Sequence, residues 1–340
     1  MRPAYRSHFA IILFACWCVS GSTAAAAELH ALVTEGFPLA YNLDHEAAIA
    51  KLTKAVQVYP DNPVGHRSLA ATVWLQLLFS RRSLLVDNYL TGSISRPTGD
   101  LKPPPKELDQ LFEKHIERAI ALSERAIKLS PNDVNAHYEL GIAVGLAASY
   151  RASIRGQTFR ALRYAKRAYS AHPRALELNP NRDDAKLLVG IYRMMAYLVG
   201  FDGGKDEAIA LVRDAATYPG ETQAEAQFAL VLLLNRERQY GRAQHFLEQL
   251  RRAYPRNRLV WLETASTWLR DDRPAMANLS LAHGFSQLQG DNRTRMYGED
   301  ATWHLARVHY RQSKNLCDDA RDRRCEQAAD YDLDYPFTGP

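Results

Sequence analysis

A helix-like segment that ends in proline recurs along this chain of 340 residues, and this repetition limits the possible folds more than any other feature. The prolines are Pro60, Pro131, Pro180 and Pro255. Twelve residues before each proline stands an alanine and five residues before it an alanine or leucine, at Ala48, Ala119, Ala168 and Ala243 and at Ala55, Ala126, Ala175 and Leu250. Small residues let helices approach closely, and proline ends a helix because it lacks the backbone donor. The shared register predicts stacked helix pairs.

The residues after each proline also recur, which predicts that each proline is followed by another helix, the first helix of the next pair. Nine and ten residues after the prolines stand Leu69-Ala70, Leu140-Gly141, Val189-Gly190 and Thr264-Ala265. Asn and Asp fill the turns, where their side chains are suited to cap the next helix. Apolar residues recur at three- and four-residue steps, as in amphipathic helices. A slipped copy of the pattern surrounds Ala208, Ala215 and Pro219.

This pattern resembles the tetratricopeptide repeat over roughly residues 30–310. The matching positions include Trp261, Leu140, Gly141, Ala119, Ala126 and Pro131. The resemblance implies an all-α fold: a right-handed superhelical solenoid of antiparallel helix pairs, with the first helix of each pair on the concave face. Through Gly203, Gly204 and the segment Tyr254-Pro-Arg-Asn257, the chain also resembles exported bacterial proteins of this type with lengthened helix pairs.

The spacing of the repeats departs from the family pattern. Pro60 and Pro131 lie 71 residues apart, whereas the family repeat is about 34 residues long. We expect the extra length in one long helix from Val64 to Leu90 and in a loop from Thr91 to Pro105. The glycine, serine and proline content of that loop disfavours a continuous helix or strand.

The N-terminal residues have the order of a secretory signal peptide. Arg2 and Arg6 precede an apolar run over residues 9–19, and small residues follow up to Ala27. We expect cleavage after Ala27 and a periplasmic or secreted protein. The expected organisation is a signal peptide over 1–27, a helical repeat domain over 28–316 and a C-terminal tail over 317–340. The alternatives are an uncleaved anchor and a lipoprotein modified at Cys16. The apolar run is short for a membrane span, and we expect no later transmembrane segment.

Two cysteines, Cys317 and Cys325, remain once the signal peptide is removed. Because nearby cysteines usually pair in an oxidising compartment, we predict a disulfide between them. A metal site would show tighter spacing and further ligands. Loss of the signal peptide also removes two arginines from a formal net charge of +5. The nearly balanced remainder gives no basis for nucleic-acid binding, which requires a strongly basic face.

The motifs that could carry chemistry each lack a required part. Gly200-Phe-Asp-Gly-Gly-Lys205 resembles a phosphate-binding loop, but its first glycine is one residue too close and Asp206 replaces the hydroxyl residue. His304 and His309 are five residues apart, a spacing that does not share one helical face as four does. We therefore expect no enzyme activity, no cofactor and no metal site.

Aromatic and arginine side chains on the first helices are the candidate partner-binding residues. They are Tyr138, Arg151, Arg155, Tyr192, Arg193, Tyr197 and Trp261. Tyrosine, tryptophan and arginine are favoured at protein interfaces, where the aromatic side chains bury a large area. The alternative interpretation is that most of these aromatic residues pack inside the solenoid.

Two functions of different classes fit these observations. The first is an exported, non-catalytic adaptor that captures a protein or peptide partner in the groove of the solenoid. The alternative is a small-molecule or lipid-binding protein associated with a transport system, which the family resemblance also implies. The apolar set Tyr192, Met194, Met195, Tyr197 and Phe201 would then line a closed pocket. An open groove favours the adaptor, and an enclosed apolar cavity favours the carrier.

Overall fold

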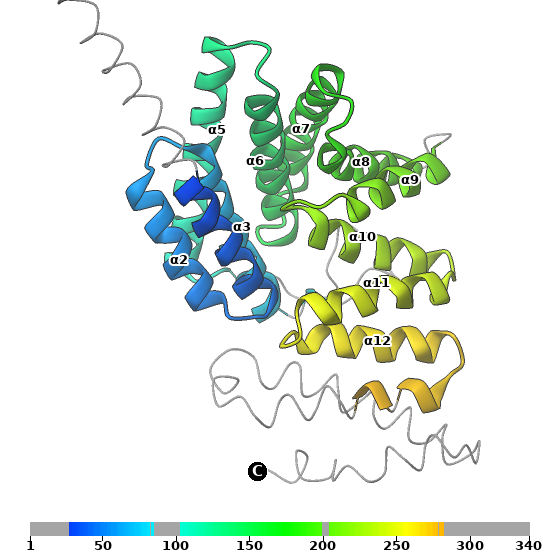
Figure 1. The fold of residues 1–340 in the computed structure, drawn as a ribbon. Coiled ribbons are helices and arrows are strands. Elements are labelled where there is room, and N and C mark those ends of the chain that lie inside the picture. The colour runs from blue at the N-terminus through cyan, green and yellow to red at the C-terminus, as the bar shows by residue number, and fades with distance from the viewer. Residues whose placement is uncertain (1–26, 82, 85–102, 199–203, 278, 282–340) are drawn as a thin grey trace, which may run out of the picture.

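The computed structural model describes residues 27–81, 83–84, 103–198, 204–277 and 279–281, and each regular element within these ranges is helical (Figure 1). The elements are the helical residues 27–41, α2 (His45–Val58), α3 (Pro63–Ser80), α5 (Lys106–Leu129), α6 (Val134–Ser153), α7 (Thr158–Leu178), the 3₁₀ turn η1 (Asp183–Ala185), α8 (Lys186–Leu198), α9 (Lys205–Thr217), α10 (Gln223–Arg236), α11 (Tyr240–Ala253) and α12 (Arg258–Arg270). A further helical stretch begins at residue 274. No helix in these ranges is long and apolar enough to span a membrane.

Each helix packs against its neighbours in the chain, from α2 on α3 to α11 on α12 (Figure 1). The result is a right-handed superhelical array of antiparallel pairs, which confirms the predicted fold class. Other predictions lie outside the described residues: the signal peptide before residue 27, Cys16, the pair Cys317 and Cys325, the histidines His304 and His309, and the tail over 317–340.

The helix ends and the packing register follow the repeated pattern. Helices α2, α5, α7 and α11 each end two residues before their proline. The alanines twelve residues before these prolines, Ala48, Ala119, Ala168 and Ala243, are completely buried. The positions five before the prolines are equally buried, except that Ala126 is only half-buried. Small side chains therefore lie where the helices approach most closely.

Asparagine and aspartate begin several of the helices that follow the prolines, as the turns predicted. The side chain of Asn62 accepts a hydrogen bond from the Val64 N–H of α3, at 2.9 Å. Asp133 caps α6 in the same way, through the backbone N–H groups of Asn135 and Ala136. Each bond satisfies a backbone donor that the first turn of a helix otherwise leaves unpaired.

The expected long helix from Val64 to Leu90 is wrong, because α3 ends at Ser80. The next residue, Arg81, donates its backbone N–H to the Leu77 carbonyl. Its guanidinium also donates to the Ile154 carbonyl at the end of α6, at 2.7 Å. These contacts fasten the end of α3 to α6.

The helices form two sets that alternate along the chain, and each member of the inner set contributes to the wall of a central cavity. The inner helices are residues 27–41, α3, α6, α8, α10 and α12, and the outer helices are α2, α5, α7, α9 and α11. Helices α3 and α6 have buried residues on all their faces, whereas α5 and α11 bury one face and expose the other. Helices α3 and α6 therefore contact neighbours on every side, and their sequences carry few polar residues.

The superhelix turns so far that the end of the helical residues 27–41 and the turn after them contact the turn between α11 and α12. The Asn257 side-chain amide donates to the Tyr41 carbonyl at 2.6 Å. The Arg256 N–H donates to the Asn42 side chain at 3.0 Å, and the rings of Tyr41 and Tyr254 lie 5.0 Å apart. These bonds join residues more than 200 positions apart and close the array around its axis.

Candidate functional site

The inner helices surround a cavity of about 340 Å³. This size lies within the range of small-molecule sites, which is about 300–1,000 Å³. Most of its wall is apolar, and every inner helix contributes to it. The apolar lining residues include Phe37, Trp74, Leu75, Leu78, Leu146, Leu187, Leu188, Ile191, Phe228 and Leu259.

A group of polar side chains interrupts this apolar wall where α3 faces the start of α10. We call Tyr41, Arg67, Glu139, Glu221 and Glu225 the polar cluster. Arg67 is its centre, with a side chain only 3 % exposed. Its Nε donates to Glu139 at 2.7 Å and its Nη2 donates to Glu221 at 2.6 Å. Burial raises the pKa of Glu139, and the neighbouring Arg67 charge opposes that shift.

Glu225 is the member of the polar cluster with an unsatisfied carboxylate oxygen. Burial raises the pKa of its carboxyl to about 7, although the nearby Tyr41 hydroxyl and its own backbone N–H lower it. Nevertheless, neither Glu225 Oε2 nor Tyr41 Oη makes a hydrogen bond within 3.5 Å to any described residue. Buried polar atoms without partners are costly and uncommon in folded proteins.

Thr222 and Glu225 have the spacing of a helix capping box at the start of α10. In that motif the threonine hydroxyl accepts a hydrogen bond from a backbone N–H of the first turn. Here the Thr222 side chain makes no capping bond, and its Oγ1 is buried without a partner among the described residues. Both side chains line the cavity instead.

The candidate residues on α6 and just after its end lie between helices and outside the cavity wall. Arg151 and Arg155 are brought together because both pair with Glu113 of α5, at 3.1 and 3.3 Å. Tyr138 is buried, and the Arg182 guanidinium lies 3.9 Å from the centre of its ring. Their described contacts are structural, and their role in partner binding stays a prediction.

The candidate residues on α8 lie beside α7 and α9. The Tyr192 ring packs edge-on against Tyr169 at 5.5 Å, and Arg193 pairs with Glu207. Tyr197 is exposed. The carrier interpretation placed a pocket around these residues, but the observed cavity is lined by the preceding turns of α8. Phe201 lies outside the described residues.

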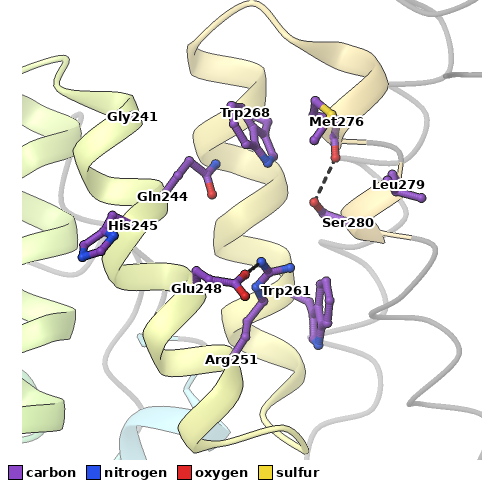
Figure 2. Close-up of a pocket in the computed structure, with 10 residues that line it drawn as sticks. All are labelled: Gly241, Gln244, His245, Glu248, Arg251, Trp261, Trp268, Met276, Leu279 and Ser280. Carbon is purple, nitrogen blue, oxygen red and sulfur yellow. Dashed lines mark hydrogen bonds and ion pairs between the residues drawn. The ribbon is translucent and has the colours of Figure 1, made fainter.

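Trp261 lines a second hollow, between α11, α12 and the helical stretch after residue 274 (Figure 2). This hollow has a volume of about 430 Å³ and is more open than the central cavity. The Arg251 guanidinium lies 4.4 Å from the centre of the Trp261 ring and pairs with Glu248. Trp268 forms another part of the wall.

Sequence reasoning missed the polar cluster, although the chain contains a signal for it. Arg67 and Glu139 are charged residues within helices α3 and α6, which are otherwise mainly apolar. A charge on a helix that is buried on all sides needs a partner, because an isolated buried charge is very costly. Their complementary signs could have indicated that these two inner helices meet.

The chain matches no family model and no curated protein. Among solved structures, it is similar to the human IFIT1 dimer with m7Gppp-AAAA, at 15 % identity and a TM-score of 0.38, over 87 % of this chain and 67 % of that one. It is similar to yeast Tom70 at 11 % identity and a TM-score of 0.28, over 88 % and 91 % of the two chains. The P58(IPK) TPR domain shows 13 % identity and a TM-score of 0.20, over 89 % and 98 %. These sequence identities and TM-scores are too low to indicate a function for this chain.

Proposed function

We propose that this protein is a non-catalytic binding protein that holds a small, mainly apolar ligand inside its superhelix. The observation that carries this proposal is the cavity of about 340 Å³ among the inner helices. The hydrogen bond from Asn257 to Tyr41 joins the two ends of the described array, so helices from both ends contribute to the wall of the cavity. Ligand sites are typically concave and mostly apolar, with a few placed polar groups.

Filling the cavity tests this proposal. Ala71 of α3 lines the cavity, so Ala71→Phe would occupy part of it. Ala121 of α5 is exposed, so Ala121→Phe is a matched control. Binding of the neutral fluorescent probe N-phenyl-1-naphthylamine should be similar in the wild type and the control. Probe binding should be at least about tenfold weaker in Ala71→Phe, because the phenylalanine ring occupies part of the cavity and reduces the apolar surface that the probe can bury. Equal binding to all three proteins would refute the proposal.

A second function, docking of a partner protein, is favoured by an exposed apolar stripe on α7. Phe159 and Leu162 are 87 % and 60 % exposed, and Tyr169 follows on the same face. An apolar stripe that faces solvent is typical of an interaction surface. Tyr169 contacts Tyr192, so one candidate residue of the adaptor adjoins this stripe.

Site-specific photocrosslinking tests the docking function in the native cell. A photoreactive phenylalanine at position 159 should yield one discrete crosslinked protein. The same residue at Lys54, an exposed position on α2, should not. Equal labelling from both positions would contradict a specific docking surface.

Export is part of the same proposal and rests on the N-terminal sequence. The expected mature protein begins at Glu28, because the small residues before it form the cleavage site. N-terminal sequencing of protein purified from its native compartment measures this directly. A mature chain that begins at lipid-modified Cys16 would instead indicate a membrane-anchored lipoprotein.

A further inference from the structure

Carboxylates outnumber cationic side chains in the wall of the cavity. The acidic lining residues are Asp184, Glu221, Glu225 and Glu263, whereas Arg67 is the only arginine or lysine among the described lining residues. Burial lowers the pKa of the two lining histidines, His45 and His172, to about 4, so both are neutral at physiological pH. An interior with this excess of negative charge attracts a cation.

Most of these carboxylates already have a cationic partner. Asp184 pairs with Arg182 at 3.3 Å and Glu263 pairs with Arg270 at 2.9 Å. Glu221 shares the Arg67 guanidinium with Glu139. Within the described residues, Glu225 is the lining carboxylate that forms no ion pair within 4.0 Å.

Two other lining residues, Tyr41 and Thr222, also carry buried oxygen atoms without a hydrogen-bond partner among the described residues, and Tyr41 lies near the Glu225 carboxyl. Tyr41 is only 5 % exposed, and its Oη makes no hydrogen bond to a described residue. The buried Oγ1 of Thr222 also makes no hydrogen bond to a described residue, and Thr222 lies in the turn that precedes α10. The wall of the cavity therefore contains three buried oxygen atoms without a hydrogen-bond partner, on Tyr41, Thr222 and Glu225, and the last two residues are three positions apart at the start of α10.

We propose that the ligand is a small apolar primary amine, with its ammonium group held by Glu225, Tyr41 and Thr222. This inference rests on the proposed function, because it assumes that the cavity holds a ligand. An ammonium group has three N–H donors and no acceptor, which matches three free acceptor atoms. Its charge compensates the buried carboxylate, and its apolar body contacts the surrounding leucines. A carboxylate ligand would meet like charge at the same place.

Amine binding should depend on pH through Glu225. The titratable and charged groups that face its carboxyl are Tyr41, Arg67, Glu221 and Tyr254. Burial raises the Glu225 pKa to about 7, so about half of the carboxyl groups are protonated at that pH without ligand. The ammonium binds the charged form, because opposite charges attract. Amine affinity should therefore rise as the pH increases through about 7, a range in which an alkylamine stays protonated.

Calorimetric titration of the full mature chain with n-octylamine, n-octanol and n-octanoate tests this inference. The three probes share one chain length and differ in the head group. The wild type should bind octylamine about tenfold or more tightly than octanol, because hydrogen bonds to charged groups are the stronger ones. Octanoate should bind most weakly. In Glu225→Gln, octylamine affinity should fall to that of octanol, and its pH dependence should disappear.

Two other variants separate recognition of the amine from loss of the fold. Glu107→Gln alters an exposed carboxylate on α5 and should bind octylamine as the wild type does. Tyr41→Phe keeps the buried ring, removes one acceptor and should weaken octylamine severalfold without affecting octanol. If octanol and octanoate bind as tightly as octylamine, the amine inference is overturned and the cavity proposal stands. If none of the three binds, the proposed function itself fails.

Discussion

Among the described glycines, Gly141 of α6 leaves the least room for an added side chain, and it gives the sharpest stability prediction. A Cβ atom at this position would lie 2.1 Å from both Nδ1 and Cε1 of the His172 ring on α7. His172 is 1 % exposed, and its ring packs at 6.0 Å against the ring of Tyr138. The ring therefore has little space into which it could move. We expect Gly141→Ala to destabilise the fold.

Two opposing effects determine how much Gly141→Ala changes the free energy of unfolding. Alanine in place of glycine within a helix gains up to about 1 kcal/mol from backbone propensity. Overpacking of a close contact costs about 1–3 kcal/mol, and a separation of 2.1 Å places Gly141 near the upper end of that range. The net loss should be about 1–2 kcal/mol. Gly241 of α11 is the matched control, because no atom lies within 4 Å of its added Cβ. Gly241→Ala should stabilise by up to about 1 kcal/mol.

Urea unfolding followed by far-ultraviolet circular dichroism measures these differences. The set should include Gly141→Ala, His172→Ala and the double variant, because removal of the ring removes the obstacle. The double variant should be more stable than the sum of the single effects by more than about 0.5 kcal/mol. A Gly141→Ala protein as stable as the wild type, or single effects that simply add, would refute the close approach of α6 and α7.

Three other measurements address a buried histidine, the closure of the superhelix and the C-terminal cysteines. Burial lowers the pKa of His172 to about 4 from 6.5, so the unfolded chain binds more protons between these values. The contribution of neutral His172 to the free energy of unfolding should therefore be complete above pH 6.5 and should fall by about 3 kcal/mol toward pH 4. Urea titrations at several pH values measure this dependence, which should shrink in His172→Ala. Asn257→Ala should cost about 1–3 kcal/mol and speed hydrogen exchange around Tyr41, because it removes the 2.6 Å bond across the closure; unchanged exchange there would contradict the role of this bond. Mass spectrometry of non-reduced mature protein should show Cys317 joined to Cys325, and two free thiols would contradict that pairing.

The helix pairs could be predicted from the sequence because the interactions that specify them are local. Each of the four repeat prolines follows the end of a helix, because proline disfavours the helical conformation of the residue before it, and an alanine twelve residues earlier marks the face on which the next helix packs. Ala48 and Ala243 occupy corresponding places in distant repeats, and both are completely buried. The end of α3 was harder to predict. The helix ends at Ser80 through contacts of Arg81 with α6, which lies more than 70 residues further along the chain.

The direction in which each aromatic side chain points depended on the packing of whole helices. Tyr138 and Tyr192 lie on inner helices, as the repeat pattern indicated, but their rings contact Arg182 and Tyr169 at neighbouring elements. The position of a residue within the repeat determines which helix carries it. The crossing angles and the lengths of the neighbouring helices then decide which of its residues reach the axis.

The central cavity was decided only by the tertiary structure. Tyr41, Arg67 and Glu225 come from three separate parts of the chain, and taken singly each has an ordinary role on a helix. They meet because each repeat adds a small rotation, and the accumulated rotation brings Asn257 against Tyr41, 216 positions away. Local patterns thus determined that helix pairs form and stack. The sum of many small rotations determined that the stack closes around a cavity and which charges face it.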